Sequence, residues 1–357
     1  MAVRYRNPVI AGFHPDPSIC RVGEDYYLAV SSFEYFPGVP LFHSRDLVHW
    51  TQIGHALNRP SQLNLTGTAC SEGIYAPTLR HHDGRFHLVT THVWSGGGNF
   101  YVWTDDIHAN AWSEPVWLDD PDWFDPSLCF ASDGRVYYTR RSAHQIVQSE
   151  FDPVRGRLLS APRPIAAPFV SRDGEGPHVY EIAGRYYLLT AEGGTAAGHM
   201  ICIGRSDTPW GPFEPCPHNP ILTHARQTAL QVRSTGHGDL FQAHDGTWWL
   251  VCLGTRHQPR NGAAFHHLGR ETLLAPVTWR DGWPVINGGC CLALDMEVTS
   301  LPAWQPPVTP EAVRRPFALA PGSRTLGFEW THLRNPTPGS WQLTDADVLL
   351  LHGSSSR

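Results

Sequence analysis

Three acidic side chains occupy matching places in this sequence. Asp16 and Asp125 each begin an Asp-Pro-Ser segment, and Glu175 directly precedes a Gly-Pro-His segment. A lone Asp-Pro is most often a turn or a strand cap. Three acids at repeated positions are harder to explain as caps, because gathering like charges costs free energy unless the site uses them. Two carboxylates on either side of a bond, one protonated and one ionised, are the groups that hydrolysis of a glycosidic bond requires.

The elements that must position these acids form an internal repeat. A turn followed by a strand rich in aromatic residues recurs at 23–32, 84–91, 134–142, 184–192 and 246–254. Equivalent residues are 50 to 62 positions apart, which is enough for a four-stranded sheet and its loops. Four-stranded units repeated five times are best buried around an axis. The sequence therefore predicts an all-β fold, with a five-bladed β-propeller over residues 1–295.

A propeller would bring the acids together. The first strand of every blade lines the central channel, so the residues that begin these strands meet at one rim. Aromatic residues that follow the inner strands either stack on sugar rings there or pack between blades. Read blade by blade, the rim positions are Asp16, Ala76, Asp125, the pair Glu175 and Gly176, and His237.

Length and composition exclude several other chemistries. The chain has 357 residues and a formal net charge of −6, which does not favour nucleic acid or an anionic membrane as a partner. All 27 basic residues are arginine, so Schiff-base chemistry, pyridoxal phosphate attachment and the phosphate-binding GxxxxGK loop are excluded. The motifs GxSxG, HExxH and CxxC are also absent.

The compartment is predicted from the N-terminus and the cysteines. The opening segment, MAVRYRNPVIAGFHPDP, has no apolar stretch long enough for a signal peptide, and no run of about 18 apolar residues occurs in the chain. Most of the eight cysteines lie in apolar, strand-like surroundings, where a free thiol acts as a small hydrophobic group. We expect a cytoplasmic protein with reduced cysteines.

Several segments, in order along the chain, resemble glycoside hydrolase family 43. They are NPVIAGFHPDPSIC with Asp16, FDPSLCF with Asp125, EGPHVY with Glu175, AEGGT at 191–195, and HLGRET at 267–272 followed by DGWPV. The resemblance covers about residues 5–290 and is greatest to the β-xylosidase and α-L-arabinofuranosidase group.

This resemblance implies a role for each acid. Asp16 is expected to act as the general base that activates water, and Glu175 as the general acid that protonates the leaving oxygen. Asp125 is expected to orient Glu175 and to raise its pKa. The outcome would be inversion, for which the base and the acid stand about 6.5 to 9.5 Å apart.

The same resemblance implies further site residues. Arg270 is expected to reach the site and hold sugar hydroxyls or a carboxylate, unless it forms an ordinary surface ion pair. His237 matches a histidine that in some relatives helps to hold a calcium ion through water, although a hydrogen-bonded core histidine explains it equally well. No metal ligand and no required cofactor are predicted. Phe33 and Thr195 match pocket-lining positions, and Tyr75 stands where many xylosidases carry tryptophan.

The C-terminal part departs from the family pattern. Residues 296–357 are expected to form a proline-rich linker and an incomplete β segment, in which 325–351 resembles the opening strands of a β-sandwich. In two-domain relatives a sandwich loop helps to close the pocket. A more open site, or a truncated chain, is therefore expected here.

The functional prediction is an inverting exo-glycosidase that releases terminal xylose, arabinofuranose or both from short plant-derived oligosaccharides. A non-catalytic propeller that binds sugar or protein on its rim is the alternative. Related five-bladed fructan hydrolases are disfavoured, because HPDPS replaces their Asn-Asp-Pro-Asn opening. The expected partner is a small oligosaccharide, without nucleic acid or membrane, and homo-oligomerisation is left open.

Overall fold

A computed structural model describes residues 3–94, 97–120, 124–143, 145–260, 263–302, 330–335, 341–345 and 348–351. Strands dominate this part of the chain, and its two helices are single 3₁₀ turns, η1 (Ile107–Ala109) and η2 (Asn287–Gly289). Neither of these helices of the described residues has the length and apolar character needed to span a bilayer.

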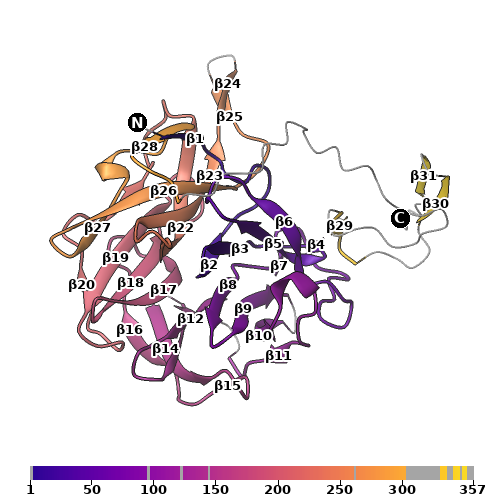
Figure 1. Cartoon of the computed structure of the whole chain (residues 1–357), viewed down its shortest axis with the longest axis horizontal. Helices are drawn as coiled ribbons and strands as arrows, with labels where there is room; N and C mark the ends of the chain where they lie inside the picture. The colour runs from indigo at the N-terminus through magenta and orange to yellow at the C-terminus, as the bar shows by residue number, and fades with distance from the viewer. Residues whose placement is uncertain are drawn as a thin grey trace.

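Five antiparallel sheets follow one another around a common axis (Figure 1). Blade 1 contains β2 (Ser18–Val22), β3 (Asp25–Ala29), β5 (Gly38–Ser44) and β6 (Thr51–Leu57). Blade 2 contains β7 (Gly73–Ile74), β8 (Thr78–His82), β9 (Arg85–Val93), β10 (Gly98–Thr104) and β11 (Val116–Trp117). Blade 3 contains β12 (Phe124–Phe130), β13 (Val136–Ser142), β14 (Gln145–Asp152), β15 (Arg157–Leu158) and β16 (Arg163–Ala166).

The last two blades complete the ring and confirm the predicted five-bladed β-propeller. Blade 4 contains β17 (Gly174–Ile182), β18 (Arg185–Glu192), β19 (Met200–Ser206), β20 (Glu214–Pro215) and β21 (Leu222–Thr223). Blade 5 contains β22 (Val232–Gln242), β23 (Trp248–Arg256), β26 (Glu271–Arg280) and β27 (Trp283–Ile286).

The repeated turn-and-strand segment forms the first hairpin of every blade. Its aromatic strand is the second strand of the sheet, namely β3, β9, β13, β18 and β23. The glycine that opens each copy has a positive φ, between 61° and 85°, which a glycine adopts without the steric cost that a side chain brings. The repeat is therefore recognisable in the sequence because it encodes a local turn.

A buried ion pair joins the inner strands near the axis. Asp239 of β22 is fully buried and accepts two hydrogen bonds from Arg80 of β8, at 2.8 and 3.2 Å. It also accepts from Ser18 of β2 at 2.8 Å and from the Tyr180 hydroxyl of β17 at 2.7 Å. Burial alone would raise the pKa of Asp239, but Arg80 and these donors hold it well below the usual range. The cluster thus ties four blades together around one neutralised charge.

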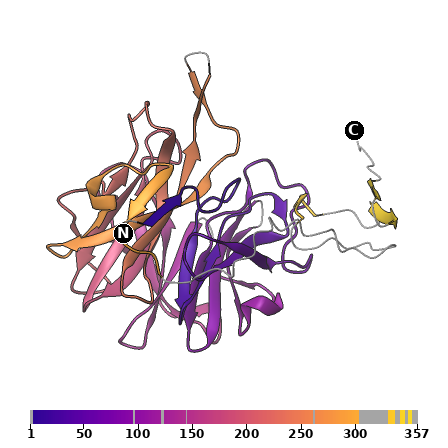
Figure 2. The same cartoon turned by 45° about the horizontal axis from the view of Figure 1, so that its top comes forward.

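The two ends of the propeller meet in a short sheet. β1 (Val3–Arg6) pairs with β28 (Asp295–Val298), and Figure 2 shows the indigo first strand beside the orange last one. The expected division at residue 295 falls on the first residue of β28. Because β28 is hydrogen-bonded to β1, the chain remains attached to its own N-terminal strand as far as Val298.

Besides β1 and β28, six short strands of the described residues lie outside the blades. β24 (Gln258–Arg260) pairs with β25 (Ala263–Phe265), and β30 (Trp341–Asp345) pairs with β31 (Val348–Leu351). β4 (Tyr35–Phe36), in a blade 1 loop, pairs with β29 (His332–Leu333) from the C-terminal segment. Residues 303–329, which include most of the expected proline-rich linker, are outside the described part. Of residues 325–351 the structure describes only 330–335, 341–345 and 348–351, so their resemblance to a β-sandwich remains a prediction.

Candidate active site

The rim residues share an uncommon backbone conformation. Asp16, Asp125, Gly176 and His237 have φ values of 54°, 54°, 54° and 44°, at the equivalent point of four inner strands. The register of β12, β17 and β22 shifts at this point, as in a β-bulge. A positive φ is unfavourable for a residue with a side chain and occurs chiefly in tight turns and at functional sites. The equivalent of Asp16 in blade 4 is therefore Gly176, and Glu175 lies one residue before it.

Asp16 is a buried carboxylate surrounded by donors and cations. Ser31 Oγ donates to its Oδ2, and Arg270 Nη1 donates to its Oδ1 at 3.3 Å. His237 Nδ1 lies 3.6 Å from the same Oδ1. Burial by itself would raise the pKa of Asp16, but Arg270, His237 and Ser31 outweigh burial and lower it. Asp16 is therefore ionised near neutral pH, as a general base must be.

Arg270 brings three of the predicted residues to one place. Besides Asp16, its Nη1 donates to Thr195 Oγ1 at 3.1 Å. Its guanidinium lies over the Phe33 ring, 5.1 Å from the centroid. The partner of Arg270 is thus a buried carboxylate, with Phe33 and Thr195 beside the same guanidinium, unlike that of an ordinary surface ion pair.

Asp125 and the backbone beside Glu175 are directly joined. The N–H of Gly176 donates to Asp125 Oδ2 at 3.0 Å. Burial raises the pKa of Asp125; His237 opposes this rise, while the charges of Glu175 and Asp16 add to it. Asp125 therefore holds the peptide that follows Glu175, and the two carboxyl groups titrate as an interacting pair.

Glu175 is in an environment opposite to that of Asp16. Burial raises the pKa of Glu175, and the negative charge of Asp16 raises it further. His237, Arg141 and Arg270 lower it, but the net shift is upward. A lowered pKa on one carboxyl group and a raised pKa on the other is the pattern by which a base and an acid are assigned.

His237 lies at the centre of the three acids. Its side chain is buried, and its imidazole influences the pKa of Asp16, Asp125 and Glu175. A Cβ atom on Gly176 would lie 2.8 Å from His237 Cε1, so only glycine leaves room for this ring. The absence of a side chain at Gly176 is thus part of the site.

The residues around His237 do not form a donor set suited to the calcium ion that some relatives hold at this position. Calcium takes six to eight oxygen ligands. Among the described residues, no group of three or more His, Cys, Asp and Glu side chains is arranged to hold a metal ion. Near His237 the groups are an imidazole, Asp16 and Arg270, and the cation already neutralises the carboxylate.

A series of aromatic rings borders the acids. Phe13 and Phe33 have ring centroids 5.6 Å apart, Phe33 and Tyr75 are 5.2 Å apart, and Tyr75 and Phe124 are 6.1 Å apart. Phe124 directly precedes Asp125, so the series extends from blade 1 to blade 3. Such rings offer flat apolar faces for stacking. Phe33 and Tyr75 were predicted from the sequence, whereas Phe13 and Phe124 were not.

Sequence reasoning also missed Arg141 and His199. Arg141 Nη1 lies 3.3 Å from Glu175 Oε2, yet in the sequence it is one residue of the repeated strand. His199 is buried, which lowers its pKa to about 4, and its ring occupies the space beside Gly236, where a Cβ atom would lie 2.4 Å away. No sequence signal marks Arg141, whose position opposite Phe124 follows from the pairing of β12 with β13 in the structure. His199 is in a loop that no repeat marks.

A family comparison agrees with this site. The sequence model of glycosyl hydrolases family 43 matches residues 5–284, a span that contains all three acids. The chain belongs to glycosyl hydrolases family 43. The resemblance recognised from its motifs is confirmed.

Family 43 relatives cover most of this chain. A non-reducing end α-L-arabinofuranosidase of Bacteroides ovatus is 45% identical over 96% of the chain and 63% of its own length. A β-xylosidase of Bacillus subtilis is 39% identical over 84% of the chain and 60% of its own length. The solved structure of a xylan β-1,4-xylosidase from Bacillus halodurans is 37% identical, with a TM-score of 0.81, over 94% of this chain and 66% of the other. The chain thus spans roughly two thirds of the length of these relatives.

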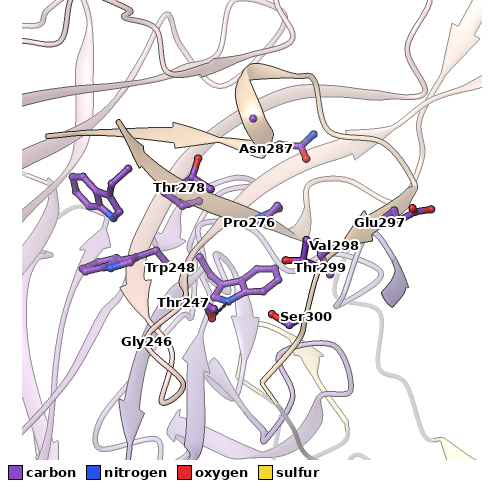
Figure 3. A pocket seen from close by; sticks show the side chains of 14 residues that line it. Gly246, Thr247, Trp248, Pro276, Thr278, Asn287, Glu297, Val298, Thr299 and Ser300 are labelled. Atoms are coloured by element: carbon purple, nitrogen blue, oxygen red, sulfur yellow. Dashed lines mark hydrogen bonds between the residues drawn. The ribbon is translucent and has the colours of Figure 1, made fainter. Parts of the chain in front are cut away.

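Another concavity of this family 43 chain is at the outer edge of blade 5 (Figure 3). It has a volume of about 490 Å³ and lies between β23, β26, η2 and the end of β28, where Trp248, Trp279 and Asn287 contribute to its lining. Glu297 is the single acidic residue of that lining. Acid–base hydrolysis needs two carboxyl groups, so the rim of the channel, and not this concavity, is the candidate active site.

Proposed function

We propose that this family 43 chain is an inverting exo-glycosidase, which removes terminal xylose, arabinofuranose or both from short plant-derived oligosaccharides. The observation that carries the proposal is the opposite pKa shift of two carboxyl groups at one rim, downward for the buried Asp16 and upward for the partly buried Glu175. A propeller that only binds sugar would not need this difference. The names of its relatives, xylosidases and arabinofuranosidases, support the choice of sugars.

The proposed reaction is a single displacement. Asp16 accepts a proton from water, and the water oxygen forms a bond to the anomeric carbon of the terminal sugar. Glu175 gives its proton to the glycosidic oxygen, whose bond to that carbon breaks. The products are a sugar of inverted configuration, a shortened oligosaccharide with a new hydroxyl group, a protonated Asp16 and an ionised Glu175; proton exchange with solvent restores both residues.

The other rim residues prepare these two steps. Arg270 and Ser31 keep Asp16 ionised and fixed, and the same guanidinium lies beside Thr195, where a sugar hydroxyl would bind. Asp125 holds the backbone that carries Glu175. The aromatic series replaces water around the sugar ring, which strengthens the electrostatic interactions within the pocket.

Removal of either acid tests the function. Asp16→Ala and Glu175→Ala should each lower kcat on nitrophenyl xyloside or arabinofuranoside, by roughly 10²- to 10⁴-fold for loss of a general base or acid. Asp207→Ala is a matched control, because Asp207 is an exposed carboxylate paired with Arg185 at 3.3 Å. NMR detection of the first-formed anomer reports the stereochemistry. Wild-type turnover in both active-site variants would overturn the assignment of Asp16 and Glu175 as base and acid. A first-formed product with the anomeric configuration of the substrate would overturn the inverting mechanism.

A cytoplasmic location is proposed on separate grounds. All eight cysteines are free thiols, and five of them are buried. Reduced cysteines are typical of a reducing compartment. Fractionation of the producing cells, with the chain detected by antibody, tests this proposal; recovery outside the cytoplasmic fraction would contradict it.

A further inference from the structure

We propose that Arg141 is a positioning residue that determines which oxygen of Glu175 carries the catalytic proton; this rests on the acid role of Glu175 proposed above. No motif of the sequence analysis pointed to Arg141. The structure places its guanidinium against the carboxyl group of Glu175 and over the ring of Phe124, which the sequence also did not mark as a site residue.

The guanidinium of Arg141 is held in a defined orientation. Arg141 is near the end of β13, directly opposite Phe124 of β12. Its Nε donates to the carbonyl oxygen of Ala143 at 3.0 Å, and its Cζ lies 4.7 Å from the centroid of the Phe124 ring. Asp173 Oδ1 is 3.8 Å from Nη2. These contacts leave Nη1 directed at Glu175 Oε2, 3.3 Å away.

The chemistry of this contact selects one oxygen. A guanidinium has five N–H donors and no acceptor, so the oxygen that faces it must accept. When Glu175 is neutral, its proton is therefore placed on Oε1, and Oε2 remains the acceptor for Arg141. The proton is then available from the oxygen that the cation does not occupy.

The same contact stabilises the charge that forms during the reaction. As Glu175 gives up its proton, the carboxyl group becomes an anion beside a fixed cation, both only 19% exposed. Such preorganised charge favours the transition state over the ground state. Burial and the charge of Asp16 act in the opposite direction, so Arg141 limits how weak an acid Glu175 becomes.

Arg141→Met tests this role, with Arg141→Lys as the variant that keeps a positive charge. The substrates are aryl xylosides or arabinofuranosides whose phenol leaving groups differ in acidity, together with a disaccharide that ends in the same sugar. We expect Arg141→Met to lower kcat/KM for the disaccharide about 10- to 100-fold, part of the 10²- to 10⁴-fold that general acid catalysis supplies. Dinitrophenyl glycosides, whose leaving group needs no proton, should be hydrolysed at nearly the wild-type rate.

A shift of the pH profile is the second readout. Removal of the cation raises the pKa of Glu175, so the alkaline limb of kcat/KM should move to higher pH in Arg141→Met and return toward the wild-type position in Arg141→Lys. The control is Arg135→Met, because Arg135 precedes the same strand and pairs with Glu150 at 3.2 Å, away from the acids. It should change neither readout.

The outcomes separate this inference from the proposed function. An equal loss on all leaving groups, or an unshifted alkaline limb, would show that Arg141 does not act through the proton of Glu175. The enzymatic function would still stand if Glu175→Ala lost activity on the disaccharide. If Glu175→Ala hydrolysed the disaccharide like the wild type, the acid role itself, and with it this inference, would be wrong.

Discussion

Asp239 and the three acids of the rim belong to the inner part of the same propeller, and their surroundings differ. Asp239 accepts two hydrogen bonds from one arginine, and also from Ser18 and Tyr180, so its charge is fully compensated. At the rim, Asp125 accepts one backbone N–H and Glu175 faces one arginine, while the charge of each acid acts on its neighbours. The difference shows that burial alone does not make a carboxylate functional. At Asp239 and at Asp16, cations and donors outweigh burial and lower the pKa, whereas at Asp125 and Glu175 burial prevails and raises it. The rim, unlike the Asp239 cluster, thus combines carboxyl groups whose pKa values are shifted in opposite directions.

The strongest test of this comparison replaces one acid by its amide at the rim, Asp16→Asn, and one in the structural cluster, Asp239→Asn. Asp16→Asn should lower kcat by roughly 10²- to 10⁴-fold, because the amide cannot accept a proton from water. Its thermal unfolding temperature should remain close to that of the wild type, because Arg270 reaches solvent and can be hydrated. Calorimetry combined with turnover measurements checks both expectations, and a large loss of stability would assign Asp16 to the structural group.

Asp239→Asn should show the opposite behaviour. It leaves Arg80 without its charged partner, and breaking a buried pair typically costs about 3 to 5 kcal/mol of stability. The free energy of unfolding from urea titration measures this, with Asp207→Asn as the exposed control, for which a surface pair predicts a loss of about 1 kcal/mol or less.

The pH dependence of this loss follows from the same contacts. The folded-state pKa of Asp239 is below its usual value of 3.8, so its stabilising effect is complete above that value and is lost as the pH falls below it. The difference between wild type and Asp239→Asn should narrow in acid. A constant difference down to low pH would contradict the ionic origin of the effect.

Arg270→Met is expected to have a smaller effect, on the pH profile. Arg270 is the main group that lowers the pKa of Asp16 against burial. Without it that pKa rises, and because the base must be ionised, the acidic limb of kcat/KM should move to higher pH. Arg45→Met, which removes an exposed arginine paired with Glu24 at 2.8 Å, is the control. An unchanged acidic limb would mean that Asp16 is not the group titrating there.

The repeats allowed much of the fold to be predicted. Each blade begins with a hairpin whose turn glycine and aromatic strand are adjacent in sequence, so five copies were visible without the structure. Asp16 and Asp125 were found because they begin a repeated segment. Glu175 was treated as a pair with Gly176, and the bulge in β17 explains why both matter: Gly176 makes room for His237, and Glu175 precedes it.

Residues outside the repeated positions were not predictable in the same way. Arg141 fits the sequence pattern of an ordinary strand residue. It reaches Glu175 only because β12 pairs with β13 and because β17 has a bulge at Glu175. Phe13 is in the segment before β2, and His199 is in the loop before β19. No local pattern distinguishes such residues from ordinary surface or core positions.

The sequence by itself determined the number of blades, the order of the strands and all three acids, because hairpin turns and strand patterns depend on neighbouring residues and each acid lies in a short recognisable segment. Only the tertiary structure decided which carboxyl group has a lowered pKa and which has a raised one. A pKa depends on burial and on charges that come from distant parts of the chain, such as Arg270, which is 254 positions from Asp16, and Arg141, which is 34 positions from Glu175.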